Sequence, residues 1–138
     1  MPAEAGVPAG PRHQARERAL GLLYEAELKQ VAVEEVLGGL AAQPDPYALA
    51  LVRGVVAHQD RIDELVGTAA RGWELERMPV VDRVLLRMAT YELLAEPGVP
   101  VSVVIDEAVE LAGRYSTDDS GRFVNGVLAT VAAVARGS

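Results

Sequence analysis

A polar loop runs directly into a helix in the stretch Tyr115-Ser-Thr-Asp-Asp-Ser-Gly-Arg-Phe-Val-Asn-Gly-Val-Leu128. The last polar residues of the loop are good N-caps, because a side-chain oxygen can accept from the free amides of the first turn; these are Thr117, Asp118, Asp119 and Ser120. From 123 to 131, apolar residues repeat at helical spacing and predict one buried face. Gly126 interrupts this helix at a cost of about 1 kcal/mol relative to alanine. We therefore expect a second helix to approach closely there.

The same loop carries groups that suit single-stranded RNA. Tyr115 and Phe123 flank it, and Arg122 lies between them. Aromatic faces stack on unpaired bases, and a cation beside a helix N-terminus favours phosphate. Asp118 and Asp119 could also be read as a general acid/base pair, but adjacent acids at a helix start are more simply caps.

Composition sets limits on the class of protein. The chain has 138 residues, 50% of them hydrophobic, and no cysteine. We expect one domain with a substantial core and no disulfide or thiol chemistry. No apolar run reaches the roughly 18 residues of a membrane span, and the N-terminus lacks the pattern of a secretion signal. A cytoplasmic protein without membrane contact is therefore expected. The net charge of −7 argues against a general nucleic-acid coating protein but permits a local basic site.

Periodicity predicts helices throughout. We expect residues 1–11 to form a disordered arm and residues 12–138 to form a single all-helical domain. The helices are expected at about 12–29, 33–40, 45–71, 79–95, 100–115 and 120–135. Val101, Val103 and Val104 could also suit a strand, but no partner strand is available. The sum is an all-α, compact bundle of six to seven helices.

Some side chains can be placed from this pattern. Asp82, Arg83 and Arg87 are expected on the outer side of the fourth helix. Trp73 follows a helix end and is expected to fill the space between two helical layers.

The helix near 12–29 opens on the most basic stretch of the chain, which contains Arg12, His13 and Arg16. Cations at a helix N-terminus oppose the helix dipole, so an external anion is expected there. The alternative is an ordinary solvated helix face.

No pattern of catalytic chemistry is present. The sequence has no glycine-rich phosphate loop and no nucleophile elbow. His13 and His58 are far apart, without cysteines or paired spacing, so we expect no metal site. We expect neither an enzyme nor a cofactor.

Four stretches in this order resemble the NusB family of transcription antitermination factors. They are Ala15-Arg-Glu-Arg-Ala-Leu20 with Leu23-Tyr24, Val81-Asp-Arg-Val-Leu-Leu-Arg87 with Tyr91-Glu-Leu93, Val99-Pro100 followed by Ile105-Asp-Glu-Ala-Val-Glu-Leu-Ala112, and Asp119-Ser120 through Phe123-Val-Asn-Gly-Val-Leu128. The resemblance implies an all-helical fold of two packed halves and a role without catalysis. It also implies a partner, the ribosomal small-subunit protein NusE. The pair would bind single-stranded boxA RNA in ribosomal RNA leaders and act within the RNA polymerase antitermination complex.

The resemblance also assigns residues. It places an RNA site on Arg12, His13, Arg16, Tyr115, Asp119 and Arg122, with the two segments side by side. It places contacts to NusE on Tyr24, Asp82 and Phe123. His13 and Gln14 stand where family members often carry basic residues, which predicts weak RNA binding by this chain alone.

Two other functions fit the same features. One is an RNA-docking domain like that of ribosomal RNA cytosine methyltransferases. The other is a homodimeric interaction protein whose basic helix is buried.

Overall fold

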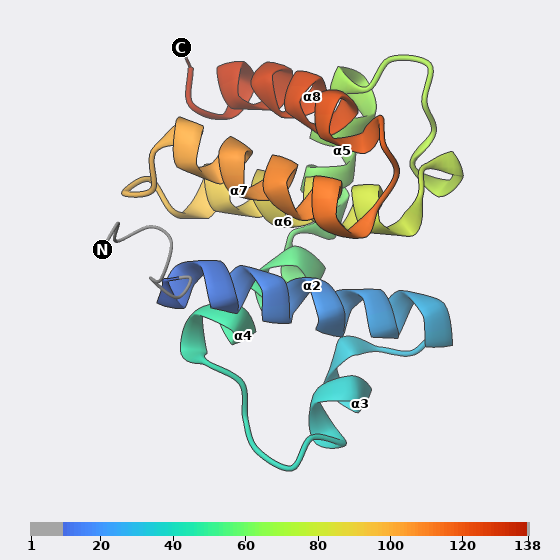
Figure 1. Cartoon of the computed structure of the whole chain (residues 1–138), viewed down its shortest axis with the longest axis vertical. Coiled ribbons are helices and arrows are strands. Elements are labelled where there is room, and N and C mark those ends of the chain that lie inside the picture. The colour runs from blue at the N-terminus through green and yellow to red at the C-terminus, as the bar shows by residue number, and fades with distance from the viewer. Residues whose placement is uncertain (1–9, 138) are drawn as a thin grey trace.

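The computed structural model describes residues 10–137, and every regular element within them is helical (Figure 1). The elements are α2 (Pro11–Lys29), α3 (Val33–Gly38), α4 (Pro46–Ala57), α5 (Gln59–Ala69), the short 3-10 helix η1 (Leu75–Arg77), α6 (Val80–Ala95), α7 (Val101–Tyr115) and α8 (Ser120–Ala135). The expected all-α fold is confirmed. Most of the expected N-terminal arm, residues 1–9, lies outside the described residues.

The helices form two packed halves. In the first, α2 packs against α3 and α4; in the second, α5, α6, α7 and α8 pack together (Figure 1). The halves meet where α2 and α4 contact α6. The core is aliphatic, and its largest fully buried side chains are mainly leucines from both halves: Leu22, Leu51, Leu85, Leu86, Leu93, Leu111 and Leu128. Within residues 10–137, no helix is both long and apolar enough to cross a membrane.

The single helix expected over 45–71 is wrong, because the chain breaks at His58. This residue ends α4 and precedes α5, with φ −117° and ψ 22°. Its exposed ring stacks on Tyr91, with ring centroids 5.9 Å apart. The break has a packing cause: α4 packs on α2 in the first half, whereas α5 packs on α6 and α8 in the second.

The close helix approach occurs at Gly54 and not at Gly126. A Cβ on Gly54 would lie 2.2 Å from the Tyr91 ring, so only glycine leaves room for that tyrosine. A Cβ on Gly126 would meet nothing within 4 Å. The expectation for Gly126 was wrong because this residue lies on the exposed side of α8.

Trp73 does not fill a space between layers. It is 54% exposed, and its ring meets Phe123 edge-on at a centroid distance of 5.7 Å. It lies in the connection before η1, outside the core, so the expected position is corrected.

Arg136 closes the C-terminal end of α8, a role that the sequence did not predict. Its guanidinium donates to the carbonyl oxygens of Leu93 (2.7 Å), Val99 (3.0 Å), Glu96 (3.0 Å) and Glu92 (3.3 Å). These carbonyls lie at the end of α6 and in the turn after it, so one side chain ties α8 to the α6–α7 connection.

Candidate nucleic-acid interface

The N-terminal part of α2 is anchored by a buried ion pair. Arg16 is only 5% exposed, and it donates from Nε and Nη2 to the two carboxylate oxygens of Glu92, each at 2.8 Å. Tyr47 also donates to Glu92, at 2.6 Å. Burial lowers the pKa of Arg16, but hydrogen bonding and attraction to Glu92 outweigh it, so the pKa is raised overall. Arg16 was expected to bind RNA, but its guanidinium is buried and hydrogen-bonded to Glu92.

Arg12 lies outside this ion pair and is exposed. Its guanidinium stacks over the Tyr47 ring at 4.0 Å from the centroid. Burial, followed by the hydrogen bond to Glu92, raises the pKa of Tyr47, which keeps this tyrosine neutral. The neutral ring thus supports a cation that still faces solvent.

His13 links α2 to α7. Its Nδ1 donates to Oε1 of Glu107 at 2.7 Å and lies 3.9 Å from Oε1 of Glu110. Glu107 is also 3.5 Å from Nη1 of Arg16, which connects His13 to Arg16. Arg12 is connected to the same network through Tyr47, which donates to Glu92.

Asp82 holds the loop before α8 in place. It is 3% exposed and accepts from Ser116 (2.6 Å) and Ser120 (2.9 Å). The expectation that Asp82 lies on the outer side of its helix was wrong, because the two serine hydroxyls satisfy its carboxylate inside the fold. The same expectation was wrong for Arg83 and Arg87, which lie partly buried against Glu27 and Asp63.

Asp119 occupies the N-cap position of α8 but makes no capping hydrogen bond with its side chain. Its backbone is helical, with φ −90° and ψ −7°, whereas side-chain capping normally needs an extended residue. The carboxylate is exposed and available to an external donor.

Tyr115 joins the start of this loop to α2. Its hydroxyl donates to Glu17, which also accepts from Arg114 at 3.2 Å. The hydrogen bond from Tyr115, helped by Arg114, lowers the pKa of Glu17 despite partial burial of the carboxylate. One side of Tyr115 is thereby fixed while 48% of the residue stays exposed.

Two neighbouring hollows adjoin the loop. Tyr24 and Tyr115 line one of about 360 Å³, together with Val81. The next residue, Asp82, lines a second of about 420 Å³, with Trp73, Arg122 and Phe123 at its sides. All three residues expected to meet a protein partner therefore line one or other of these hollows.

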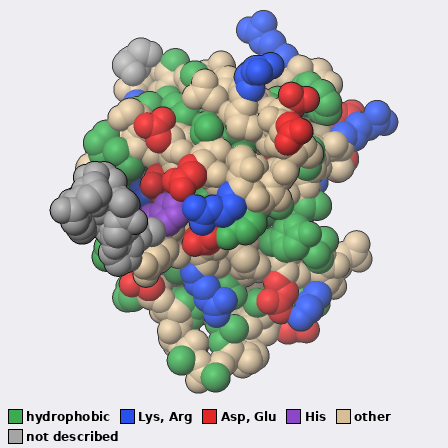
Figure 2. Space-filling view, in the orientation of Figure 1, with side chains coloured by type: hydrophobic (Ala, Val, Ile, Leu, Met, Phe, Trp, Pro, Cys, Tyr) green, Lys and Arg blue, Asp and Glu red, His purple; other side chains and the backbone are tan. Residues whose placement is uncertain are grey.

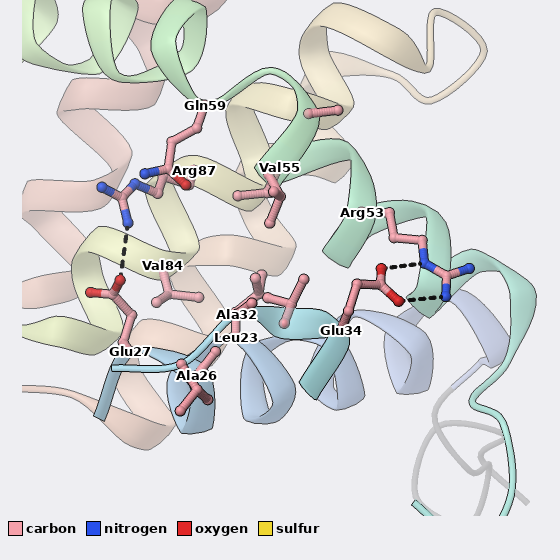
Figure 3. A pocket seen from close by; sticks show the side chains of 14 residues that line it. Leu23, Ala26, Glu27, Ala32, Glu34, Arg53, Val55, Gln59, Val84 and Arg87 are labelled. Atoms are coloured by element: carbon pink, nitrogen blue, oxygen red, sulfur yellow. Dashed lines mark hydrogen bonds and ion pairs between the residues drawn. The ribbon is translucent and has the colours of Figure 1, made fainter. Parts of the chain in front are cut away.

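A third hollow, of about 420 Å³, lies between α2, α3, α4 and α6 and contains none of the predicted site residues (Figure 3). Its floor is apolar, and its charged rim is already paired: Glu34 with Arg53 at 2.9 Å and Glu27 with Arg87 at 3.6 Å.

Comparison with known proteins identifies the family of this chain. A model of the NusB family matches residues 13–133. The chain belongs to the NusB family. Transcription antitermination protein NusB of Saccharopolyspora erythraea is 50% identical over 131 residues, which cover 91% of this chain and 88% of that protein. The protein of the same name from Salinispora arenicola is 49% identical and covers 88% of this chain and 94% of its own length.

Solved NusB structures share the fold. T. maritima NusB superposes with a TM-score of 0.82 at 37% identity, covering 91% of this chain and 92% of the other. A NusB solved with NusE and double-stranded RNA superposes with a TM-score of 0.72 at 28% identity, covering 89% of this chain and 96% of the other.

The structure brings together most of the site residues predicted from the NusB resemblance. Two hydrogen bonds, between His13 and Glu107 and between Tyr115 and Glu17, join the basic segment of α2 to α7. The loop that carries Asp119 follows α7 directly. Basic and acidic side chains alternate on the face shown in Figure 2, with no continuous basic patch. Sequence reasoning missed the supporting residues Tyr47, Glu92 and Glu107. Glu92 follows Tyr91 in a matched NusB stretch, but nothing in that stretch shows that it pairs with Arg16.

Proposed function

We propose that this chain is a transcription antitermination factor that binds RNA together with NusE. One observation carries the proposal: the exposed Arg122 and a fixed, half-exposed Tyr115 line two hollows that also contain Tyr24 and Phe123, in a member of the NusB family. The solved relative with NusE and RNA supports both partners. Relatives that are 50% and 49% identical to this chain are named for transcription antitermination, which favours this role over that of a methyltransferase docking domain.

The RNA site follows from which groups are exposed. Arg12 and Arg122 are exposed and form no ion pair with another described residue, so they are suited to bind phosphates. Tyr115 offers a ring for one base, and such stacking contributes about 1–3 kcal/mol. Asp119 accepts a hydrogen bond from a base amino group. Arg16 acts indirectly, by fixing the first turns of α2 on Glu92.

NusE is proposed to cover the two hollows. Tyr24, which is 37% exposed, and Phe123 supply apolar contact, and aromatic residues are enriched at protein interfaces. Asp82 contributes by holding the loop through Ser116 and Ser120. The target is boxA single-stranded RNA in ribosomal RNA leaders, read within the RNA polymerase antitermination complex. Sequence selectivity arises from the combined surface of the two proteins.

Affinity for RNA is low without NusE. The chain carries a net charge of −7, and His13 in the basic segment is engaged by Glu107. Few phosphate contacts mean few released counterions and a shallow dependence of affinity on salt.

The test compares arginine variants in a mixture with NusE. Arg12→Ala and Arg122→Ala should each weaken RNA binding and reduce the slope of log affinity against log salt by about 0.7, the value for one phosphate contact on a single strand. Arg61→Ala is the matched control, since Arg61 is an exposed arginine on α5 that pairs only with Glu64 among the described residues. Native affinity and slope in both Arg12→Ala and Arg122→Ala would refute this RNA site.

Self-association through the same face is the second candidate. Trp73, Tyr24 and Tyr115 are all more than one-third exposed around the two hollows, and this apolar surface also suits a second copy of the chain. Sedimentation would then show a mass that rises with concentration and falls when NusE is added. A constant monomer mass would exclude this candidate.

A further inference from the structure

Three metal-ligating side chains meet where α2 begins and where it faces α7. His13 comes from α2, and Glu107 and Glu110 come from α7; their ligand atoms all lie within 4.8 Å of one another. Glu107 and Glu110 share one face of α7 because they are three positions apart. No sequence spacing could have revealed the cluster, since 94 positions separate His13 from Glu107.

The distances suit a small metal ion. Nδ1 of His13 lies 2.7 Å from Oε1 of Glu107 and 3.9 Å from Oε1 of Glu110. Ligand atoms around tetrahedral zinc are about 3.4 Å apart, given bonds of about 2.0–2.2 Å. Side-chain rotation alone can therefore bring the three atoms to ligand spacing. The side chain of His13 is 12% exposed and that of Glu110 is 51% exposed. The cluster is therefore buried at His13 and open to solvent at Glu110.

The local charge also favours a cation. Two cations lie close to the cluster: Nη2 of Arg114 is 3.3 Å from Glu110, and Nη1 of Arg16 is 3.5 Å from Glu107. Arg16 is held through Nε and Nη2 by Glu92, and Arg114 also contacts Glu17 at 3.2 Å. Arg16 and Glu92 neutralise each other, and Arg114 is shared between Glu110 and Glu17, so acids still outnumber cations around the cluster when His13 is neutral. Like charge opposes the approach of a phosphate.

We propose that His13, Glu107 and Glu110 bind a divalent transition-metal ion of the Zn²⁺ type. An imidazole nitrogen in the ligand set favours such ions, whereas Mg²⁺ prefers oxygen ligands alone. The metal takes the position of the Nδ1 proton, and the neutral imidazole keeps its proton on Nε2. Three protein ligands leave one coordination position open, as in other sites of this ligand number. That position accepts a phosphate oxygen of RNA, a step that rests on the proposed function; metal binding itself does not.

The test is a calorimetric titration of the untagged full-length chain with Zn²⁺, with Mg²⁺ as the comparison ion. One Zn²⁺ should bind per chain, and Mg²⁺ should bind far more weakly. Glu110→Gln and His13→Ala should each weaken Zn²⁺ binding by at least about tenfold. His58→Ala and Glu35→Gln are matched controls, because they remove the other histidine and an exposed glutamate of α3. Thermal unfolding without metal checks the fold of each variant, and Glu110→Gln is the safer one because Glu110 is exposed.

Absence of Zn²⁺ binding, or native affinity in folded Glu110→Gln, would overturn the metal site. RNA affinity measured with and without Zn²⁺ tests the second step: a gain should occur in the native chain and be absent in Glu110→Gln. Zn²⁺ binding without that gain would refute the link to RNA and leave the metal site standing. A chain that binds Zn²⁺ but no RNA under any condition would refute the proposed function together with the link to RNA, and would leave the metal site standing.

Discussion

At the level of single residues, Arg16 shows how burial changes the meaning of a charge. A basic residue near a helix N-terminus indicates an anion site, yet here the anion is Glu92 within the same chain. Loss of binding in an Arg16 variant would therefore not identify an RNA contact, since the variant also leaves Glu92 buried and unpaired.

Arg16→Ala should lower the free energy of unfolding by about 3–5 kcal/mol, the typical cost of breaking a buried ion pair. Arg12→Ala should cost no more than about 1 kcal/mol, because it removes one exposed cation–π contact. Urea denaturation of the two variants and the native chain measures both values. Equal destabilisation by the two substitutions would contradict the buried role of Arg16.

Tyr115 makes a second prediction at this level, through the pKa of Glu17. The hydrogen bond from Tyr115 is the main reason that this pKa lies below its ordinary value. Tyr115→Phe should therefore raise the pKa of Glu17, as followed by NMR titration of its side-chain carboxyl. A depressed carboxylate pKa stabilises the fold above the ordinary value and loses that effect as pH falls through the folded-state pKa. The stability difference between the native chain and Tyr115→Phe should thus shrink below about pH 4.

Tyr24→Phe is the control, since the Tyr24 hydroxyl makes no hydrogen bond to another described residue. An unchanged Glu17 titration in Tyr115→Phe would show that this contact does not form in solution.

At the level of helices, the two glycines Gly54 and Gly126 should respond in opposite ways to alanine. Gly54→Ala should destabilise the fold, because the new methyl group overlaps the Tyr91 ring and overpacking typically costs about 1–3 kcal/mol. Gly126→Ala should stabilise it by up to about 1 kcal/mol, since the site is open and alanine favours helix. Thermal unfolding measures both. Destabilisation by Gly126→Ala would mean that another helix approaches α8 there after all.

The periodicity of the sequence predicts some features of the helices, such as buried faces, but it cannot predict features that depend on tertiary contacts. The buried stripe of α2 follows from 3.6-residue periodicity, and the residues expected on it are all buried: Ala15, Ala19, Leu22, Leu23 and Ala26. The break at His58 carries no proline or glycine signal, because it is imposed by the different partners of α4 and α5. Asp82 was misplaced for the same reason, since Ser116 and Ser120 are distant in sequence.

For the whole molecule, the resemblance predicted two packed halves and an RNA site where the basic segment meets the loop before α8. The structure shows the two halves and joins α2 to the start of the loop through Glu17 and Tyr115, and RNA binding there stays a prediction. The resemblance could not predict that two basic residues of this site, His13 and Arg16, are paired with Glu107 and Glu92, because these are tertiary contacts. This pairing is the physical reason to expect that the chain needs NusE to bind RNA well.

The most direct measurement is binding of a labelled boxA-like single-stranded RNA and a scrambled control over a salt series, with and without NusE. We predict weak binding of both RNAs by the chain alone, and tight binding that favours the boxA-like RNA once NusE is present. Equal affinity for the two RNAs in the presence of NusE, or no binding to either, would contradict the proposed composite RNA site.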